Sequence, residues 1–92
     1  MELIILGQPV QGREIYKNQT QWNITRGPYQ VIINEWRWDH SNYKNYTYYL
    51  KIGSECLLHN QKSVDTPEEA IAIIDTTLSE YISHKKQVEQ LY

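Results

Sequence analysis

The spacing of apolar residues changes once along this chain, near residue 65. In the segment "VDTPEEAIAIIDTTLSEYISHKK" they recur every three or four positions, which is the period of an amphipathic helix. The apolar stripe consists of Ala70, Ile71, Ile74, Leu78, Tyr81 and Ile82. We therefore expect a helix over residues 66–86, with a tail at 87–92 that either extends the helix or frays.

Both ends of the expected helix carry residues that are typical of helix termini. Thr66 and Glu69 have the spacing of a capping box, and Pro67 suits the first helical position, where no amide donor is needed. The basic residues at 84–86 stand where they would complement the negative end of the helix dipole. The sequence therefore predicts a start at residue 66 and an end near residue 86.

Before residue 65 the hydrophobic period is two, and β-branched and aromatic residues dominate, as in strands. Strands are expected near Glu2–Leu6, Gln11–Tyr16, Gln21–Thr25, Tyr29–Trp38 and Tyr46–Ile52, and more weakly at Glu55–His59. Turn residues such as Gly7–Pro9 and Gly53–Ser54 separate them. The connections are too short for parallel crossovers, so neighbouring strands should run antiparallel.

These elements predict an α+β fold: an antiparallel β-meander of four to six strands with one C-terminal α-helix packed on one face. A chain of 92 residues has material for one hydrophobic core. We expect a single domain over residues 1–92, strand-rich over 1–64.

The aromatic residues are concentrated at 34–50, "NEWRWDHSNYKNYTYYL", in a chain without phenylalanine. Tyrosine and tryptophan must therefore supply the aromatic packing of the core. We place Trp22, Tyr46 and Tyr48 in the core, because the two tyrosines alternate with Leu50 and Ile52 on one face of a strand.

The strand at 29–38 is apolar in its first half and charged in its second. We assign Val31, Ile32 and Ile33 to the interior and place residues 36–43 at the tip of a hairpin that protrudes past the helix. Aromatic rings beside basic side chains are enriched in binding hot spots. For Trp36, Trp38, Tyr43 and Tyr49, packing in the core and contact with a ligand are equally weighted alternatives. The candidate binding residues are Trp36, Arg37, Trp38, His40, Tyr43, Lys44, Tyr49 and Lys51.

The formal charge of −2 is distributed unevenly. Residues 1–64 contain seven basic and five acidic residues, a sum of +2, whereas residues 65–92 contain two basic and six acidic residues, a sum of −4. An excess of two positive charges on the sheet would neutralise few phosphates. The charge pattern therefore favours a protein partner over nucleic acid.

The motifs of common catalytic and cofactor sites are not found in this sequence. His40, His59 and His84 lack the spacing of a metal site, and neither a Gly-rich phosphate loop nor a nucleophile elbow occurs. We expect no enzymatic activity, no cofactor and no metal, and we expect Cys56 to be a small buried apolar residue. A single cysteine and the lack of a signal-peptide pattern predict a cytoplasmic protein.

Two function classes follow. The first is a protein–protein interaction module or inhibitor, of the accessory type found in phages and mobile elements, that binds a protein partner or a second copy of itself. The second is a nucleic-acid-binding domain that uses its sheet face. The segment "SVDTPEEAI" resembles the helix start of three-strand-plus-helix DNA-binding domains of the AP2 type and of some integrase arms, which implies DNA binding by the sheet. The Arg- and Trp-dense, glycine-punctuated strands of that family are not reproduced here.

Overall fold

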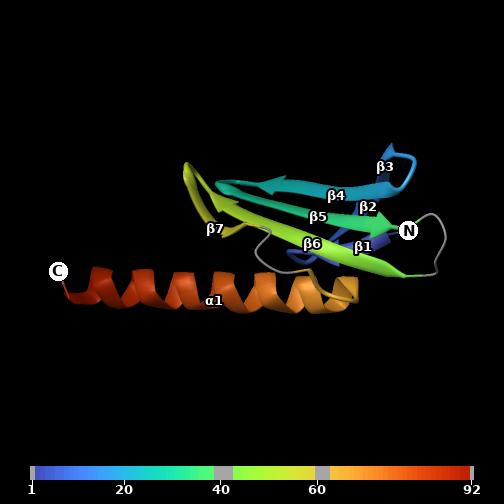
Figure 1. Ribbon diagram of the computed structural model, residues 1–92. Helices are drawn as coiled ribbons and strands as arrows, with labels where there is room; N and C mark the ends of the chain where they lie inside the picture. The colour runs from blue at the N-terminus through green and yellow to red at the C-terminus, as the bar shows by residue number, and fades with distance from the viewer. Residues whose placement is uncertain (1, 39–42, 60–62, 92) are drawn as a thin grey trace.

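A computed structural model describes residues 2–38, 43–59 and 63–91, with side chains up to Lys85. Its elements in chain order are β1 (Glu2–Ile5), β2 (Gln8–Gln11), β3 (Arg13–Tyr16), β4 (Gln19–Arg26), β5 (Tyr29–Arg37), β6 (Lys44–Ile52), β7 (Glu55–His59) and α1 (Pro67–Leu91). Strands β3 to β7 form a five-stranded sheet in sequence order, and β1 and β2 form a separate hairpin. All pairings are antiparallel. The predicted α+β fold is confirmed (Figure 1).

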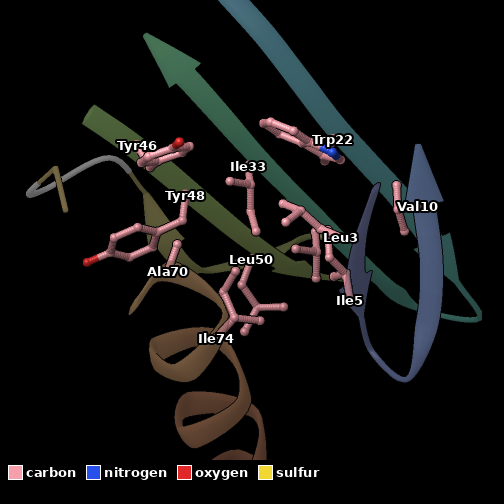
Figure 2. Close-up of a cluster of buried hydrophobic side chains, with 11 residues drawn as sticks. Leu3, Ile5, Val10, Trp22, Ile33, Tyr46, Tyr48, Leu50, Ala70 and Ile74 are labelled. Carbon is pink, nitrogen blue, oxygen red and sulfur yellow. The ribbon is translucent and has the colours of Figure 1, made fainter. Parts of the chain in front are cut away.

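The five-stranded sheet has one covered and one uncovered face. The face that we call the inner face carries Trp22, Ile33 and Tyr48, which occupy one row of paired residues across β4, β5 and β6. Helix α1 contacts this face at β5 and β6, and the β1–β2 hairpin adds to the same core through Leu3 and Val10 (Figure 2). The opposite side is the outer face, on which Asn23, Thr25 and Trp36 are exposed.

The core confirms the placement of the predicted buried aromatic residues. Trp22, Tyr46 and Tyr48 are buried together with Leu50 and Ile74. Figure 2 shows the side chain of Ile74 from α1 next to Leu50 of β6. Full burial of such side chains stabilises a fold by about 1.5–3 kcal/mol each, so this layer of contacts between helix and sheet holds α1 in place.

Two of the three β5 residues that were predicted to lie in the interior are buried there. Val31 and Ile33 are completely buried on the inner face. Ile32 is only half-buried, because alternation along the strand directs it to the outer face, between Asn23 and Tyr49 in the neighbouring strands. Cys56, also predicted to be buried, is exposed. Cys56 belongs to β7, an edge strand of the sheet, and pairs with Lys51 of β6.

The first two strands differ most from the expected pattern. The predicted break at residues 7–9 is shorter in the structure, where Leu6 and Gly7 alone make the turn with φ values of 53° and 74°. Two consecutive positive φ values are typical of a tight β-hairpin turn. Pro9 lies inside β2, which it can do because β2 pairs with β1 alone and has a free edge.

Gly12 divides the segment that was predicted as one strand, 11–16, into β2 and β3. A Cβ atom at this position would lie 2.8 Å from Cε2 of Trp22 and 3.0 Å from Cγ2 of Thr20. The chain therefore passes from the hairpin to the sheet directly over the edge of the buried indole ring. Only glycine allows this close approach without displacing Trp22.

Helix α1 begins where the capping residues predicted. The amide of Glu69 donates to Oγ1 of Thr66 at 3.2 Å, and Pro67 is the first helical residue. The helix continues to Leu91, so the tail extends it, which is one of the two alternatives expected for residues 87–92. His84 and Lys85 consequently lie more than a turn before the helix terminus, and the expectation that residues 84–86 complement the end of the dipole is wrong.

The molecule is elongated. Its principal extents are 56 × 22 × 21 Å and its radius of gyration is 14.7 Å, compared with about 12 Å for a compact domain of this length. Figure 1 shows the reason: the C-terminal part of α1 runs past the end of the sheet. Among the described residues, no helix combines the length and apolar character that a membrane span would need.

Candidate functional site

The eight predicted binding residues do not form one surface. Trp36, Tyr49 and Lys51 lie on the outer face, because they belong to the same alternating set as Asn34 and Thr47. Arg37 and Lys44 pair with each other at the last rung of the β5–β6 ladder, on the inner side. Trp38 directly follows Arg37 in the chain, and Tyr43 directly precedes Lys44. His40 lies outside the described residues.

Large aromatic side chains are exposed at this end of the sheet. Trp36 is 40% exposed, Trp38 58% and Tyr43 51%. The structure adds Tyr16, which is 70% exposed and is paired with Gln19, the residue that faces Trp36 on the next strand. We call the four residues Tyr16, Trp36, Trp38 and Tyr43 the aromatic end.

The indole of Trp36 is held in place by a hydrogen bond across the sheet. Its Nε1 donates to Oγ1 of Thr47 in β6 at 3.1 Å. Since this is the only polar hydrogen of the indole, the ring can offer a ligand its apolar faces but no further donor. An aromatic ring with a fixed orientation loses little conformational entropy when it binds. Trp36 is therefore suited to stacking and apolar contact.

Amide side chains make a second ordered group on the outer face beside Trp36. Oδ1 of Asn34 accepts hydrogen bonds from Nε2 of Gln19 and from Nε2 of Gln21, both at 3.0 Å. These bonds connect β4 to β5 on the surface of the sheet. Oδ1 of Asn45, which pairs with Trp36, is buried and has no hydrogen-bond partner among the described residues. The outer face is thus mainly neutral and polar around its aromatic residues.

Arg37 belongs to a partly buried cluster of charged and polar groups. Its Nη1 lies 2.8 Å from Oε1 of Glu35 and donates to Oγ1 of Thr20 at 2.8 Å, while Nη2 lies 3.8 Å from Oε1 of Glu14. Nη2 also donates to the carbonyl of Lys17 at 3.3 Å. The guanidinium group is therefore already satisfied within the fold, and we leave Arg37 out of the contact surface.

Glu35 is the buried carboxylate of this cluster, with 6% of its surface exposed. The hydroxyl of Tyr46 donates to its Oε2 at 2.7 Å. Burial by itself would raise the pKa of Glu35, but the hydrogen bonds from Tyr46 and Arg37 and the charge of Lys44 outweigh it, so that the pKa is lowered. Burial and the bond to Glu35 raise the pKa of Tyr46 far above its usual range. The cluster joins β5 to β6 on the inner face.

Tyr49 lies further along the outer face, against the edge strand β7. Its ring meets that of His59 edge to face, with 5.4 Å between the centroids and 70° between the planes. A hydrogen bond with the Cys56 thiol, followed by the charge of its thiolate and by burial, raises the pKa of Tyr49. Tyr49 is half-buried, so it contributes less accessible aromatic surface than the aromatic end.

The charge of the outer face is weakly positive. Within the described strands it carries Arg13 and Lys51 but no carboxylate, since Glu14, Glu35 and Glu55 pair with inner-face residues. The acidic residues of the C-terminal part lie elsewhere: Glu68, Glu69, Asp75 and Glu80 are exposed on α1. In the part of the chain that the structure describes, no three His, Cys, Asp or Glu residues come together as a metal site would require.

No protein-family model, curated protein or solved structure matches this chain. Its function must therefore be inferred from the surface itself.

Proposed function

We propose that the chain is a small, non-enzymatic, cytoplasmic binding protein, a protein–protein interaction module or inhibitor, which contacts its partner through the aromatic end. The observation that carries this proposal is the exposure of Trp36, Trp38 and Tyr43 at one end of the sheet. Trp22 is buried in the core of the same fold, so the fold does not require its tryptophans to be exposed. Tryptophan and tyrosine are the residues most enriched in binding hot spots.

A protein partner is favoured over nucleic acid because the surface contains few cations. Arg13 and Lys51 are the basic residues on the outer face of the described strands, Lys17 and Lys44 are exposed beside Tyr16 and Tyr43, and the guanidinium of Arg37 is occupied by Glu35. Four phosphate contacts correspond to a slope of about −2.8 in a plot of log affinity against log salt for a single strand. Neutral amides and exposed rings instead match the polar and aromatic composition of protein-binding surfaces.

A single-stranded nucleic acid is the second candidate. It is supported by the free faces of the Trp36 ring, whose N–H is used by Thr47, together with an outer face without carboxylates in the described strands. Bases stack on such rings for about 1–3 kcal/mol each.

The test for a protein partner is affinity purification from the native host with the wild-type chain and with Trp36→Ala and Trp38→Ala. Ile4→Ala is the matched control, because Ile4 is 57% exposed on β1, outside the sheet that carries the aromatic end. We expect the same partner with the wild type and with the control. Each tryptophan variant should weaken the purified complex at least fivefold, about 1 kcal/mol. Equal binding by all four proteins contradicts the proposal.

Titration with a random-sequence single-stranded DNA at low salt separates the two candidates. We expect no binding at micromolar protein concentration. Micromolar affinity that disappears in Trp36→Ala and persists in Ile4→Ala would support nucleic-acid binding in place of a protein partner.

A further inference from the structure

A groove lies at the opposite end of the sheet from the aromatic end. It has a volume of about 620 Å³ and is bounded by α1, by the turn between β4 and β5, and by the turn between β1 and β2. Its apolar walls include Leu6, Tyr29, Leu78 and Ile82. Tyr29 begins β5 and Trp36 is near its end, so the groove and the aromatic end are separated by about 24 Å along that strand.

The apolar stripe of α1 continues past the part of the core that it covers. Leu78 is half-buried and packs against the core cluster. One turn later, Tyr81 and Ile82 are only half-buried and are not among the residues packed on that cluster. The helix backbone continues for nine more residues to Leu91, about 14 Å. Figure 1 shows this overhang of α1 beyond the sheet. Apolar residues thus line a helix face that the described part of this chain leaves partly open.

Among the side chains that the structure describes, the groove contains one of each charge. Arg26, at the end of β4, donates from Nη1 to the carbonyl of Leu6 at 2.7 Å. Asp75, on the α1 side, is exposed and has no ion-pair partner among the described residues. A surface that meets its own copy across a two-fold axis must be self-complementary. An apolar groove with one cation and one anion on opposite walls satisfies this condition.

We propose that this groove binds a second copy of the chain. In the two-fold dimer, the overhanging stripe with Leu78 and Ile82 packs against the same stripe of the copy. Arg26 of each protomer faces Asp75 of the other. A partner surface with only cations or only anions would place a like charge opposite Arg26 or Asp75. A second copy places an anion opposite Arg26 and a cation opposite Asp75. The aromatic end remains open in this dimer.

Sedimentation equilibrium of the wild-type chain and of Ile82→Asp tests the proposal. We expect the wild-type mass to rise with concentration from 11.0 kDa toward twice that value. Ile82→Asp should weaken association at least tenfold, because it places a carboxylate in the apolar contact. Ala72→Asp is the matched control, since it adds the same charge to the exposed face of α1 and should leave association unchanged. Ser79→Arg, at an exposed position in the groove, should act like Ile82→Asp without altering the core.

A charge exchange identifies the two-fold pairing. Arg26→Glu and Asp75→Arg should each weaken self-association at least tenfold, because each places like charges opposite one another. Mixing the two variants should restore association, since both ion pairs of the mixed dimer then contain opposite charges. Circular dichroism establishes that each variant is folded, and Asp75 is exposed, so at least that variant should keep its structure.

Three results would overturn the proposal. One is a wild-type chain that remains at 11.0 kDa up to about 1 mM, the concentration at which even a weak contact of about −4 kcal/mol is half-occupied. Another is a dimer that both Ile82→Asp and Ser79→Arg leave intact. The third is a mixture of folded charge variants that stays monomeric. Loss of partner binding by the tryptophan variants affects none of these outcomes, so the two proposals can fail independently.

Discussion

At the scale of single residues, Glu35 shows how a charge is accommodated on the inner face of the sheet. Its carboxylate is buried but accepts bonds from Tyr46 and Arg37. Removal of a charged hydrogen-bond partner in such a site costs about 1.5–3 kcal/mol. We expect Glu35→Gln to lower the free energy of unfolding by about 2 kcal/mol at pH 7, as measured by urea denaturation. Glu80→Gln, at an exposed position of α1, should change it by less than about 0.5 kcal/mol.

The effect of Glu35 should depend on pH in one direction. Its pKa in the folded protein is lowered below the ordinary value of 4.5, so the unfolded chain binds the proton more readily. The stability that this group contributes is therefore complete above pH 4.5 and is lost as the pH falls through the lower folded-state pKa. The difference between wild type and Glu35→Gln should shrink under acid conditions. An equal difference at neutral and at acid pH would contradict this assignment.

Residue roles were predictable where alternation along one strand decides them. Tyr46, Tyr48 and Leu50 were placed correctly because they occupy every second position of β6. The contacts of Arg37 within the fold were not predictable, because its partners Glu14 and Thr20 come from β3 and β4, and the sequence does not reveal which residues oppose each other across strands. Tyr16 was missed for the same reason. It joins the aromatic end only through the register of β3 against β4 and of β4 against β5.

At the scale of elements, the start of α1 was fixed by local chemistry and its end was not. Thr66 accepts the amide of Glu69, and an N-cap of this kind contributes about 1 kcal/mol. We expect Thr66→Ala to lower the free energy of unfolding by about that amount, measured by urea denaturation. Thr76→Ala is the control, because Thr76 is exposed within the helix. It should be neutral or slightly stabilising, since alanine has the higher helix propensity. Equal losses in both variants would exclude the capping role.

The strands show where element prediction reaches its limit. β5, β6 and β7 were expected within two residues of their observed bounds, because turn residues separate long runs with strand composition. The division into β2 and β3 was not expected, since it depends on the packing of Gly12 against Trp22, a contact between different elements. Pro9 similarly suggested a break, whereas the free edge of β2 accepts it.

At the scale of the whole molecule, the structure separates a central stable layer from an overhanging helix. β5 is hydrogen-bonded on both sides, to β4 and β6, and α1 covers both β5 and β6. Amides in such a layer exchange only when the domain unfolds, whereas an uncovered helix end opens locally at little cost in free energy. The amides of the covered strands should therefore be protected from hydrogen exchange far more strongly than those of the overhanging helix end, although both sets are hydrogen-bonded.

Amide hydrogen exchange followed by NMR measures this difference. In dilute protein, we expect the amides of Ile33 and Leu50 to exchange at least about a thousandfold more slowly than those of α1 beyond Ile82, a gap of about 4 kcal/mol. The middle of α1, near Ile74, serves as the internal control, because it is helical and buried against Leu50. It should exchange at rates close to those of the strands. Uniform protection along the whole of α1 in the dilute monomer would show that the overhang is held by contacts within the chain.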